Sequence, residues 1–389
     1  MFLCALLLAP PAPAQTPTGL AADWQQAVSL VQSGAPDQAI PILERLVTAR
    51  PDAASVRLEL GLAYFLTGDD GKARHHIRQA LAGDLDAGER RGGETILRRI
   101  DARRTWSASF GAAIIPQSNA GRRTSDGTVM IGGLPFVLNQ TAESGVGLSL
   151  NARVGWSPQL AEGVRGRFSL GIGGTIYEQS ALNDYTLRAE AGAIRDFGQR
   201  DLGAGVLAAR RWVGDSRYTD EVGVWASIGL RPSQTLRLGG RAELAERRAP
   251  GRPGLDAQLF RLTLGAEQVL SPRMAVHGRA FLTVTDARAD HESGRMAGIT
   301  LGVRHLFDGG WLGSLEATVS RELRDGPQPI FLITRRDTEL RLAARLLNRQ
   351  VQVHGFAPVL EVGHERRRSP LPLSAFSNTY VSIGIDRAF

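Results

Sequence analysis

Cysteine and lysine are nearly absent from this sequence. Of its 389 residues one is cysteine, Cys4, and it lies in an N-terminal apolar segment that we expect to be removed. Without it the chain has no thiol, which excludes disulfide bonds and cysteine-based catalysis. Lys72 is the one lysine, although Lys and Arg together number 46 and the formal net charge is +7. The arginines are spread along the chain instead of clustering, so we expect no nucleic-acid partner.

Long apolar runs are also missing after the first residues. The segment Phe2–Ala9 is apolar and is followed by Ala12-Pro13-Ala14, a small-residue cleavage pattern before Gln15. We expect residues 1–14 to be a secretory signal peptide, although no basic residue precedes the apolar run. No later segment reaches the ~18 apolar residues that a membrane-spanning helix needs. If the chain enters a membrane, it must do so with strands.

Residues 20–104 have the apolar periodicity of helices. Ala39 and Ala73 are 34 residues apart, which is the period of a tetratricopeptide repeat. About two repeats fit, followed by a capping helix near Ala87–Arg103. The repeat positions are occupied by Ala39, Leu43, Leu46 and Pro51 in one copy and by Leu60, Gly61, Tyr64, Gly68, Ala73, Ile77 and Ala80 in the next.

Two interpretations of this helical module remain open. In the first it binds a protein partner, and the candidate contact residues are Trp24, Leu60, Tyr64 and His75. In the second it is a helical plug or spacer. Arg57 stands where the repeat usually has tryptophan, which weakens the repeat pattern. Two repeats are fewer than a free-standing array needs, so we expect the module to pack against its neighbour.

From residue 105 onward the periodicity changes from helical to two. Apolar residues alternate with Arg237, Arg241 and Glu243 between Leu236 and Leu244, as in a strand with one apolar face. We expect about fourteen such strands, each long enough to cross a bilayer when tilted. Their expected ranges are 105–114, 144–156, 164–176, 185–196, 201–212, 219–231, 234–245, 256–269, 273–285, 294–306, 311–322, 335–347, 350–363 and 376–389.

The connections between these strands alternate between short turns and longer loops, which is typical of outer-membrane barrels with the short turns in the periplasm. An even strand number returns the chain end to the side of the helical module. We expect the last strand to pair with the first, and the terminal Phe389 to signal barrel assembly. The sequence thus predicts a transmembrane antiparallel β-barrel over 105–389, preceded by a small all-α domain over 20–104.

Charged residues occupy the polar faces of the expected strands. A charge on the lipid face near the bilayer midplane costs ~2–4 kcal/mol, so we expect these residues to face the lumen. We favour an ion-pair ladder that keeps the barrel rigid and hydrated over a lumen that conducts solutes or contacts cargo. The expected lumen residues are Arg153, Arg188, Arg237, Arg241, Arg261, Arg304, Arg341, Arg345, Glu243 and Glu339.

Aromatic residues are few, and most tryptophans fall near the ends of expected strands. Trp106, Trp156, Trp212 and Trp311 suit the aromatic girdle at a membrane interface, whereas Trp225 is mid-strand. The longest expected loop, 115–143, contains an apolar patch at Val129–Leu138. A disordered surface loop would be more polar, so we expect this patch to fold into the lumen as a plug.

Short motifs accompany this domain order. They are Pro116-Gln117-Ser118-Asn119 after the first strand, Arg335-Arg336-Asp337, Pro358-Val359-Leu360-Glu361, Arg366–Ser369, and Phe376-Ser377-Asn378 before the last strand. In this order, behind a signal peptide and short tetratricopeptide repeats, they resemble the surface lipoprotein assembly modifier (Slam) family of Gram-negative outer membranes. The resemblance covers nearly all of the mature chain.

The resemblance implies an outer-membrane translocon whose periplasmic repeats capture a cargo lipoprotein or secreted protein. It also implies two further partners, the barrel assembly machinery and outer-membrane lipid. A solute-conducting porin with a periplasmic protein-binding tether is the main alternative, and a surface adhesin or receptor is another. The repeats favour the translocon, because a porin needs no protein-binding module.

Catalytic motifs are missing. The sequence has no G-x-S-x-G, Walker A or H-E-x-x-H motif. Its seven histidines are scattered, and His277, His305 and His354 fall in expected strands far apart in the sequence. We therefore expect no enzyme, no metal site and no other cofactor. An outer-membrane hydrolase is the least favoured alternative.

Overall fold

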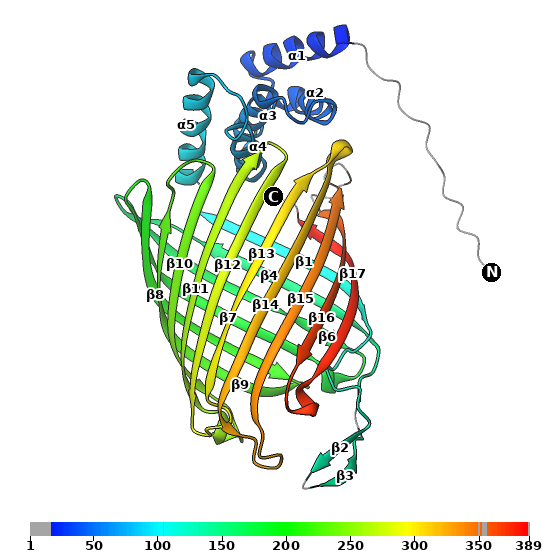
Figure 1. The fold of residues 1–389 in the computed structure, drawn as a ribbon. Coiled ribbons are helices and arrows are strands. Elements are labelled where there is room, and N and C mark those ends of the chain that lie inside the picture. The colour runs from blue at the N-terminus through cyan, green and yellow to red at the C-terminus, as the bar shows by residue number, and fades with distance from the viewer. Residues whose placement is uncertain are drawn as a thin grey trace, which may run out of the picture.

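The structure is a computed structural model that describes residues 17–103, 105–131, 133–139, 141–348, 351 and 356–387. Five helices lie over one open end of a β-barrel (Figure 1). The expected signal peptide 1–14, His354 and Phe389 lie outside the described residues. No described helix is both long and apolar enough to span a bilayer.

The helices form antiparallel hairpins in the way that tetratricopeptide repeats do. Gly34 and Gly68 have φ of 82° and 86° in the two inter-helix turns, a conformation that glycine adopts without steric cost. The Asp69 side chain accepts a hydrogen bond from the Lys72 N–H at 3.1 Å and so caps the fourth helix. The helices are α1 (Pro17–Gln32), α2 (Pro36–Ala49), α3 (Ala54–Leu66), α4 (Asp70–Ala80) and α5 (Ala87–Arg103).

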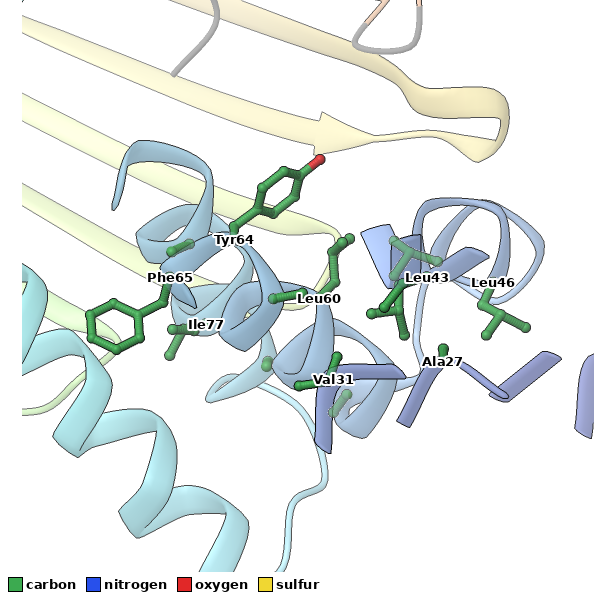
Figure 2. Close-up of a cluster of buried hydrophobic side chains, with 14 of the residues drawn as sticks. Ala27, Val31, Leu43, Leu46, Leu60, Tyr64, Phe65 and Ile77 are labelled. Carbon is green, nitrogen blue, oxygen red and sulfur yellow. The ribbon is translucent and has the colours of Figure 1, made fainter. Parts of the chain in front are cut away.

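A single hydrophobic core joins these helices. Figure 2 shows Leu43, Leu60 and Ile77 converging between the helices, and all three side chains are fully buried. Gly61 permits the close approach of α3 and α4, since a Cβ there would lie 2.5 Å from Ile77 Cγ1. Burial of these apolar side chains stabilises the module, at about 1.5–3 kcal/mol for each large one.

Arg57 is also completely buried in this core. Its Nε donates to the Pro51 carbonyl oxygen at 2.8 Å, and its Nη1 donates to Gln79 Oε1 at 2.6 Å. The guanidinium therefore ties the turn after α2 to α4, at the sequence position where the repeat usually has tryptophan. A buried charge is tolerated here because it is hydrogen-bonded.

Fourteen tilted antiparallel strands form the barrel wall. The sheet runs from β4 through β1 and β17 round to β6, and β4 also pairs with β6, which closes it. A three-residue strand, β5 (Gln159–Ala161), pairs with β6 at one rim. The wall strands are β1 (Trp106–Gln117), β4 (Gly145–Trp156), β6 (Val164–Tyr177), β7 (Asp184–Asp196), β8 (Arg200–Val213), β9 (Ser216–Leu230), β10 (Leu236–Arg248), β11 (Ala257–Ser271), β12 (Met274–Ala287), β13 (Gly294–Leu306), β14 (Trp311–Pro327), β15 (Thr334–Asn348), β16 (Phe356–Arg368) and β17 (Phe376–Arg387).

Most of the expected strands agree with these bounds to within a few residues, but the thirteenth does not. It was expected at 350–363, whereas β16 begins at Phe356 and continues to Arg368. Its pairing with β15 joins Leu347 to Val359 and Thr338 to Arg368. The long β15 therefore provides partners well beyond residue 363, and partner length is not visible in a local alternation pattern.

The first and last strands pair, as expected, and this pairing closes the barrel. Among the described residues β1 and β17 share five register pairs, from Gly111 with Asp386 to Gln117 with Tyr380. By comparison, β1 and β4 share twelve. Pro116 interrupts the β1–β17 ladder because proline has no N–H to donate. The β1–β17 seam is thus short in its described part.

The expectation that Val129–Leu138 plugs the lumen is wrong. These residues form a hairpin of β2 (Thr128–Ile131) and β3 (Leu134–Val137), which extends past the loop end of the barrel (Figure 1). Val137 is 79% exposed and Leu134 64%. The two short strands satisfy each other's backbone hydrogen bonds, so the segment does not need the barrel wall as a partner.

Candidate functional site: the barrel lumen and its periplasmic mouth

The inner and outer faces of the wall can be told apart by their contacts. Large aliphatic side chains on one row are exposed, for example Leu244 at 58% and Val206 at 55%. The opposite row carries ion pairs that join strands that are not neighbours. Arg188 Nη2 of β7 lies 2.6 Å from Glu243 Oε1 of β10, a contact that spans the sheet's concave side. Of the ten expected lumen residues, eight form ion pairs. Arg153 lines a hollow with Arg188, and Arg237 is in the same alternating row of β10 as Arg241.

One cluster of inward charges joins β7, β10 and β11. Glu190 Oε1 accepts hydrogen bonds from Arg188 Nε at 2.8 Å and Arg241 Nη2 at 3.0 Å. Glu243 Oε1 accepts from Arg188 Nη2 at 2.6 Å and Arg241 Nε at 2.8 Å. Arg261 Nη1 lies 3.5 Å from Glu243 Oε2. Two carboxylates thus hold three guanidiniums, and each carboxylate serves residues of more than one strand.

Trp225 belongs to this cluster and not to the aromatic girdle. It is 2% exposed, and its Nε1 donates to the Val206 carbonyl oxygen at 3.1 Å. The Arg241 guanidinium lies 4.6 Å from its ring centroid, a cation–π contact. A Cβ on Gly192 or Gly205 would come within 2.6 or 2.8 Å of the ring, so these glycines make room for it. The available sequence signal was a mid-strand tryptophan opposite glycine-containing strands.

A second cluster lies on the other side of the barrel, beside the seam. Glu365 is 2% exposed and its carboxylate lies 2.8 Å from Arg122 Nε and 2.9 Å from Arg341 Nε. Glu339 lies 2.7 Å from Arg367 Nη2 and 3.7 Å from Arg341 Nη2. Of the other expected lumen residues, Arg345 pairs with Asp386 across the lumen side of β16, and Arg153 lines a hollow of about 260 Å³ together with Arg188.

The loop after β1 is fastened to the start of β17. The Asn119 N–H donates to Asn378 Oδ1 at 3.0 Å, and Asn378 Nδ2 donates to Gln117 Oε1 at 2.9 Å. Asn119 Nδ2 also donates to the Ser377 carbonyl oxygen at 3.2 Å. Asn119 and Asn378 are 2% and 0% exposed. Two motifs far apart in the sequence therefore form one buried latch at the loop end of the seam.

The helical module docks on the rim that carries the short turns. Arg78 Nη2 of α4 lies 2.9 Å from Glu267 Oε1, and Glu267 Oε2 lies 3.4 Å from Arg304 Nη2. Asp52, in the turn after α2, lies 2.9 Å from Arg273 Nε in the β11–β12 turn. Because Glu267 and Arg304 are on the inward row, the module's ion pairs continue directly into the lumen.

The four expected cargo-contact residues occupy different environments. Leu60 and Tyr64 are 1% and 3% exposed and lie in the helical core (Figure 2), and Trp24 packs against the same core. His75 lines a pocket of about 210 Å³ between α4 and the barrel rim, with Arg78 and Glu267. The expectation that Leu60 and Tyr64 present themselves to cargo is therefore corrected, because their side chains hold the helices together.

Within the residues that the structure describes, no group of three or more His, Cys, Asp or Glu is placed to hold a metal ion. His277 Nε2 lies 3.1 Å from Glu316 Oε2 and His364 Nδ1 lies 2.9 Å from Thr379 Oγ1. The described histidines of the strands thus make pairwise contacts on separate parts of the wall.

Among solved structures, several outer-membrane proteins have a distantly similar fold. The outer membrane channel DcaP of Acinetobacter baumannii is 7% identical with a TM-score of 0.45, and the match covers 73% of this chain and 97% of that one. An anion-selective porin from Comamonas acidovorans is 12% identical with a TM-score of 0.40, over 73% and 100% of the two chains. The CymD monoaromatic hydrocarbon channel is 10% identical with a TM-score of 0.42, over 76% and 90%.

No curated protein matches the chain. Two family models do. One, described as tetratricopeptide repeat, matches residues 30–91, and the other, described as surface lipoprotein assembly modifier, matches residues 106–389. The second match covers most of the chain and the whole described barrel. The protein is therefore an outer-membrane β-barrel with periplasmic tetratricopeptide repeats, and it belongs to the surface lipoprotein assembly modifier family.

Proposed function

We propose that this protein is a translocon that delivers surface lipoproteins, or related secreted proteins, across the outer membrane. In this proposal residues 1–14 are a removable signal peptide, residues 20–104 receive cargo in the periplasm, and residues 105–389 form the passage. The observation that supports it is the position of the helical module. The module is joined to the lumen's inward row by the Arg78–Glu267 pair at 2.9 Å, so a bound polypeptide would lie at the entrance of the barrel.

The charged lumen suits a polypeptide passage as well. Its inward row offers carboxylates and guanidiniums in alternation, such as the Arg188–Glu243 pair, so that a passing chain meets polar groups of both signs. Cargo contacts on the helical module would come from its exposed or half-exposed side chains, because Leu60 and Tyr64 are buried. His75 is the expected contact residue that lies closest to the lumen entrance, in the pocket shared with Arg78.

Deleting residues 20–104 tests the translocon. The barrel alone should still enter the outer membrane, while delivery of a co-expressed surface lipoprotein to the cell surface should be lost. Surface display is measured by antibody labelling of intact cells. Unchanged display with the truncated chain would contradict the proposal. A full-length chain with Arg45→Gln, which alters an exposed side chain of α2 that pairs with Asp23 at 3.9 Å and not with the barrel, is the control.

The alternative is a solute porin with a periplasmic tether, which the hydrated and charged inward row supports. Planar-bilayer recordings of the purified protein separate the two. A large, steady and solute-selective conductance that persists without residues 20–104 would favour the porin. For assembly, we propose that the barrel assembly machinery reads Phe389, and Phe389→Ser should lower the amount of folded barrel in the outer membrane.

A further inference from the structure

Four neighbouring strands, β13 to β16, carry unpaired arginines on their outward faces. The five residues are exposed, and within the described parts of the chain none of them forms an ion pair or hydrogen bond through its side chain. One acidic residue, Asp325, is on the outward row of β14, four residues after Arg321. We call these five the arginine belt: Arg295, Arg321, Arg336, Arg366 and Arg368.

The inward arginines of the same strands, in contrast, form ion pairs with carboxylates. Arg324 Nη2 lies 2.5 Å from Glu322 Oε1, Arg341 Nε lies 2.9 Å from Glu365 Oε1, and Arg367 Nη2 lies 2.7 Å from Glu339 Oε2. Carboxylates are thus available on these strands, and apart from Asp325 they are placed on the inner face. Within the described residues the five outward guanidiniums have no ion-pair or hydrogen-bond partner.

The belt lies at one membrane boundary, and the described opposite ends of the same four strands carry no such group of outward arginines. All five arginines are near the long-loop ends of their strands, and the outward positions at the opposite ends include Trp311, Leu346 and Phe356. Arg366 is the register partner of Leu340, and Arg321 is two residues from Val319, which is 52% exposed. Successive outward residues are about 7 Å apart along a strand, so the belt begins at the edge of the apolar band.

A hollow of about 840 Å³ lies in the outer surface, and it comes nearest the belt at β16, where its lining residue His364 is two positions from Arg366. Four of its lining residues lie side by side on neighbouring strands: Leu301 pairs with Ala317, Ala317 with Leu342, and Leu342 with His364. Most of the residues that line the hollow are apolar, and its polar lining residues are Gln268, His277, Glu316, His364 and Thr379. His364 Nδ1 and Thr379 Oγ1 lie 2.9 Å apart at the end of the hollow nearest the belt. It lies in the part of the wall that faces acyl chains.

We propose that the arginine belt and the hollow below it form a binding site for a phosphorylated lipid of the outer leaflet. Guanidinium groups bind phosphate oxygens through paired N–H donors, and this contact is strongest where water is partly excluded. The belt holds the phosphates at headgroup level, and the hollow receives acyl chains of the same lipid. The site is independent of cargo transport, and it gives the barrel a fixed lipid-facing side in an asymmetric membrane.

The test uses the full chain in nonionic detergent and native mass spectrometry with three probes. The probes are bisphosphorylated lipid A, the same lipid without its phosphates, and inorganic phosphate. Wild type should retain the phosphorylated lipid and not the dephosphorylated one. The triple variant Arg321→Gln, Arg336→Gln, Arg366→Gln should bind it roughly a hundredfold more weakly, because each basic residue at an anionic lipid surface contributes about a factor of five.

Two variants and a folding check complete the design. Arg248→Gln is the matched control, because Arg248 is also an exposed arginine at a long-loop strand end but is already paired with Glu246 at 2.6 Å. It should bind the lipid as wild type does. Ala317→Phe fills the hollow and should weaken lipid binding while leaving the belt intact. Heat-modifiable electrophoretic mobility shows whether each variant is a folded barrel.

Three results would overturn the proposal. The first is equal binding of the lipid with and without phosphate, which would mean that the belt does not recognise the headgroup. The second is wild-type affinity in the folded triple variant or in Ala317→Phe. The third is displacement of the lipid by an equal concentration of inorganic phosphate, which would make the belt a site for a free anion.

Discussion

Asn119 and Asn378 are separated by 259 positions in the sequence, and the backbone N–H of the first donates to the side-chain Oδ1 of the second at 3.0 Å. Both residues are almost completely buried. The contact joins the loop that leaves β1 to the strand that closes the barrel. It therefore reinforces the β1–β17 seam at the end where Pro116 interrupts the backbone ladder.

Asn378→Ala should weaken this seam. The substitution leaves the Asn119 N–H and Gln117 Oε1 without their partner in a buried position, which costs about 1–3 kcal/mol for an unsatisfied buried group. The expected result is a lower unfolding temperature of the purified barrel, measured by the heat-modifiable mobility shift. Asn139→Ala, at an exposed position of the same loop, is the control and should leave the transition unchanged. Equal transitions for both variants would show that the latch does not stabilise the seam.

Glu243→Gln should change both the stability and the ion preference of the lumen. It removes the negative charge that Arg188 and Arg241 share, so the net charge of this cluster becomes more positive. We expect a loss of about 1–3 kcal/mol, because hydrogen bonds to charged groups are lost. The reversal potential in bilayer recordings should shift toward anions. Glu246→Gln lies on the outward row of the same strand and should alter neither; a shift of equal size there would argue against a lumen effect.

Gly61→Ala should destabilise the helical module. The new Cβ would lie 2.5 Å from Ile77 Cγ1, so α3 and α4 must move apart, and such overpacking costs about 1–3 kcal/mol. Gly92→Ala is the matched control in α5, where a Cβ meets nothing within 4 Å. It should stabilise the module by roughly 0.5–1 kcal/mol through helix propensity. Thermal melts followed by far-ultraviolet circular dichroism separate the two, and changes of the same sign would contradict this packing.

Arg78→Glu should loosen the module from the barrel rim, because it places a second carboxylate beside Glu267. The double variant Arg78→Glu with Glu267→Arg should restore docking in part, since Arg304 also contacts Glu267 in the native pair. Cysteines at Gly83 and Pro272 provide the readout, as a Cβ at Gly83 lies 3.0 Å from the Pro272 ring. Disulfide formation should fall in the single variant and recover in the double one. Equal disulfide yields in the wild-type background, the single variant and the double variant would show that the Arg78–Glu267 ion pair does not hold the module on the rim.

Tyr64 makes the helical module sensitive to high pH. Burial, followed by the hydrogen bond and charge of Glu44, raises the pKa of the Tyr64 hydroxyl far above its usual value of 10.0. The folded module thus retains the proton, and the associated stability is fully present below pH 10 and is lost as the unfolded chain ionises above it. Tyr64→Phe should cost about 1 kcal/mol at neutral pH, and this deficit should shrink above pH 10. The free energy of unfolding of both proteins is measured by chemical denaturation at several pH values from 7 to above 10. A difference between wild type and Tyr64→Phe that stays constant over this range would contradict the raised pKa of Tyr64.

The alternation of residues such as Leu236–Leu244 was enough to predict the strands and the inward placement of Arg237, Arg241 and Glu243. It succeeds because side chains of a strand alternate between faces whatever the strand pairs with. The helical repeats were readable for a similar reason, since Ala39 and Ala73 recur at the repeat period. The end of β16 was misplaced, because β16 continues past residue 363 to Arg368 along its long partner β15.

Other features depend on packing and pairing that the alternation pattern does not show. Nothing near Trp225 in the sequence shows that Gly192 and Gly205 of two other strands leave room for its ring. Likewise, Val129–Leu138 reads as an apolar patch in need of cover, and only the structure shows that it pairs with itself as a hairpin. Leu60 and Tyr64 read as contact residues, but the packing of α2 and α4 against α3 buries both.

The residue pattern alone predicts which side chains face inward or outward, because that choice repeats every two residues along each strand. It also determined the order of a helical module and a barrel. The tertiary structure decided which carboxylate meets which guanidinium, as with Arg188 and Glu243, and which loop fastens the seam, as with Asn119 and Asn378. These pairings follow from the closure and register of the whole sheet, and no local pattern records where a strand's distant neighbours lie.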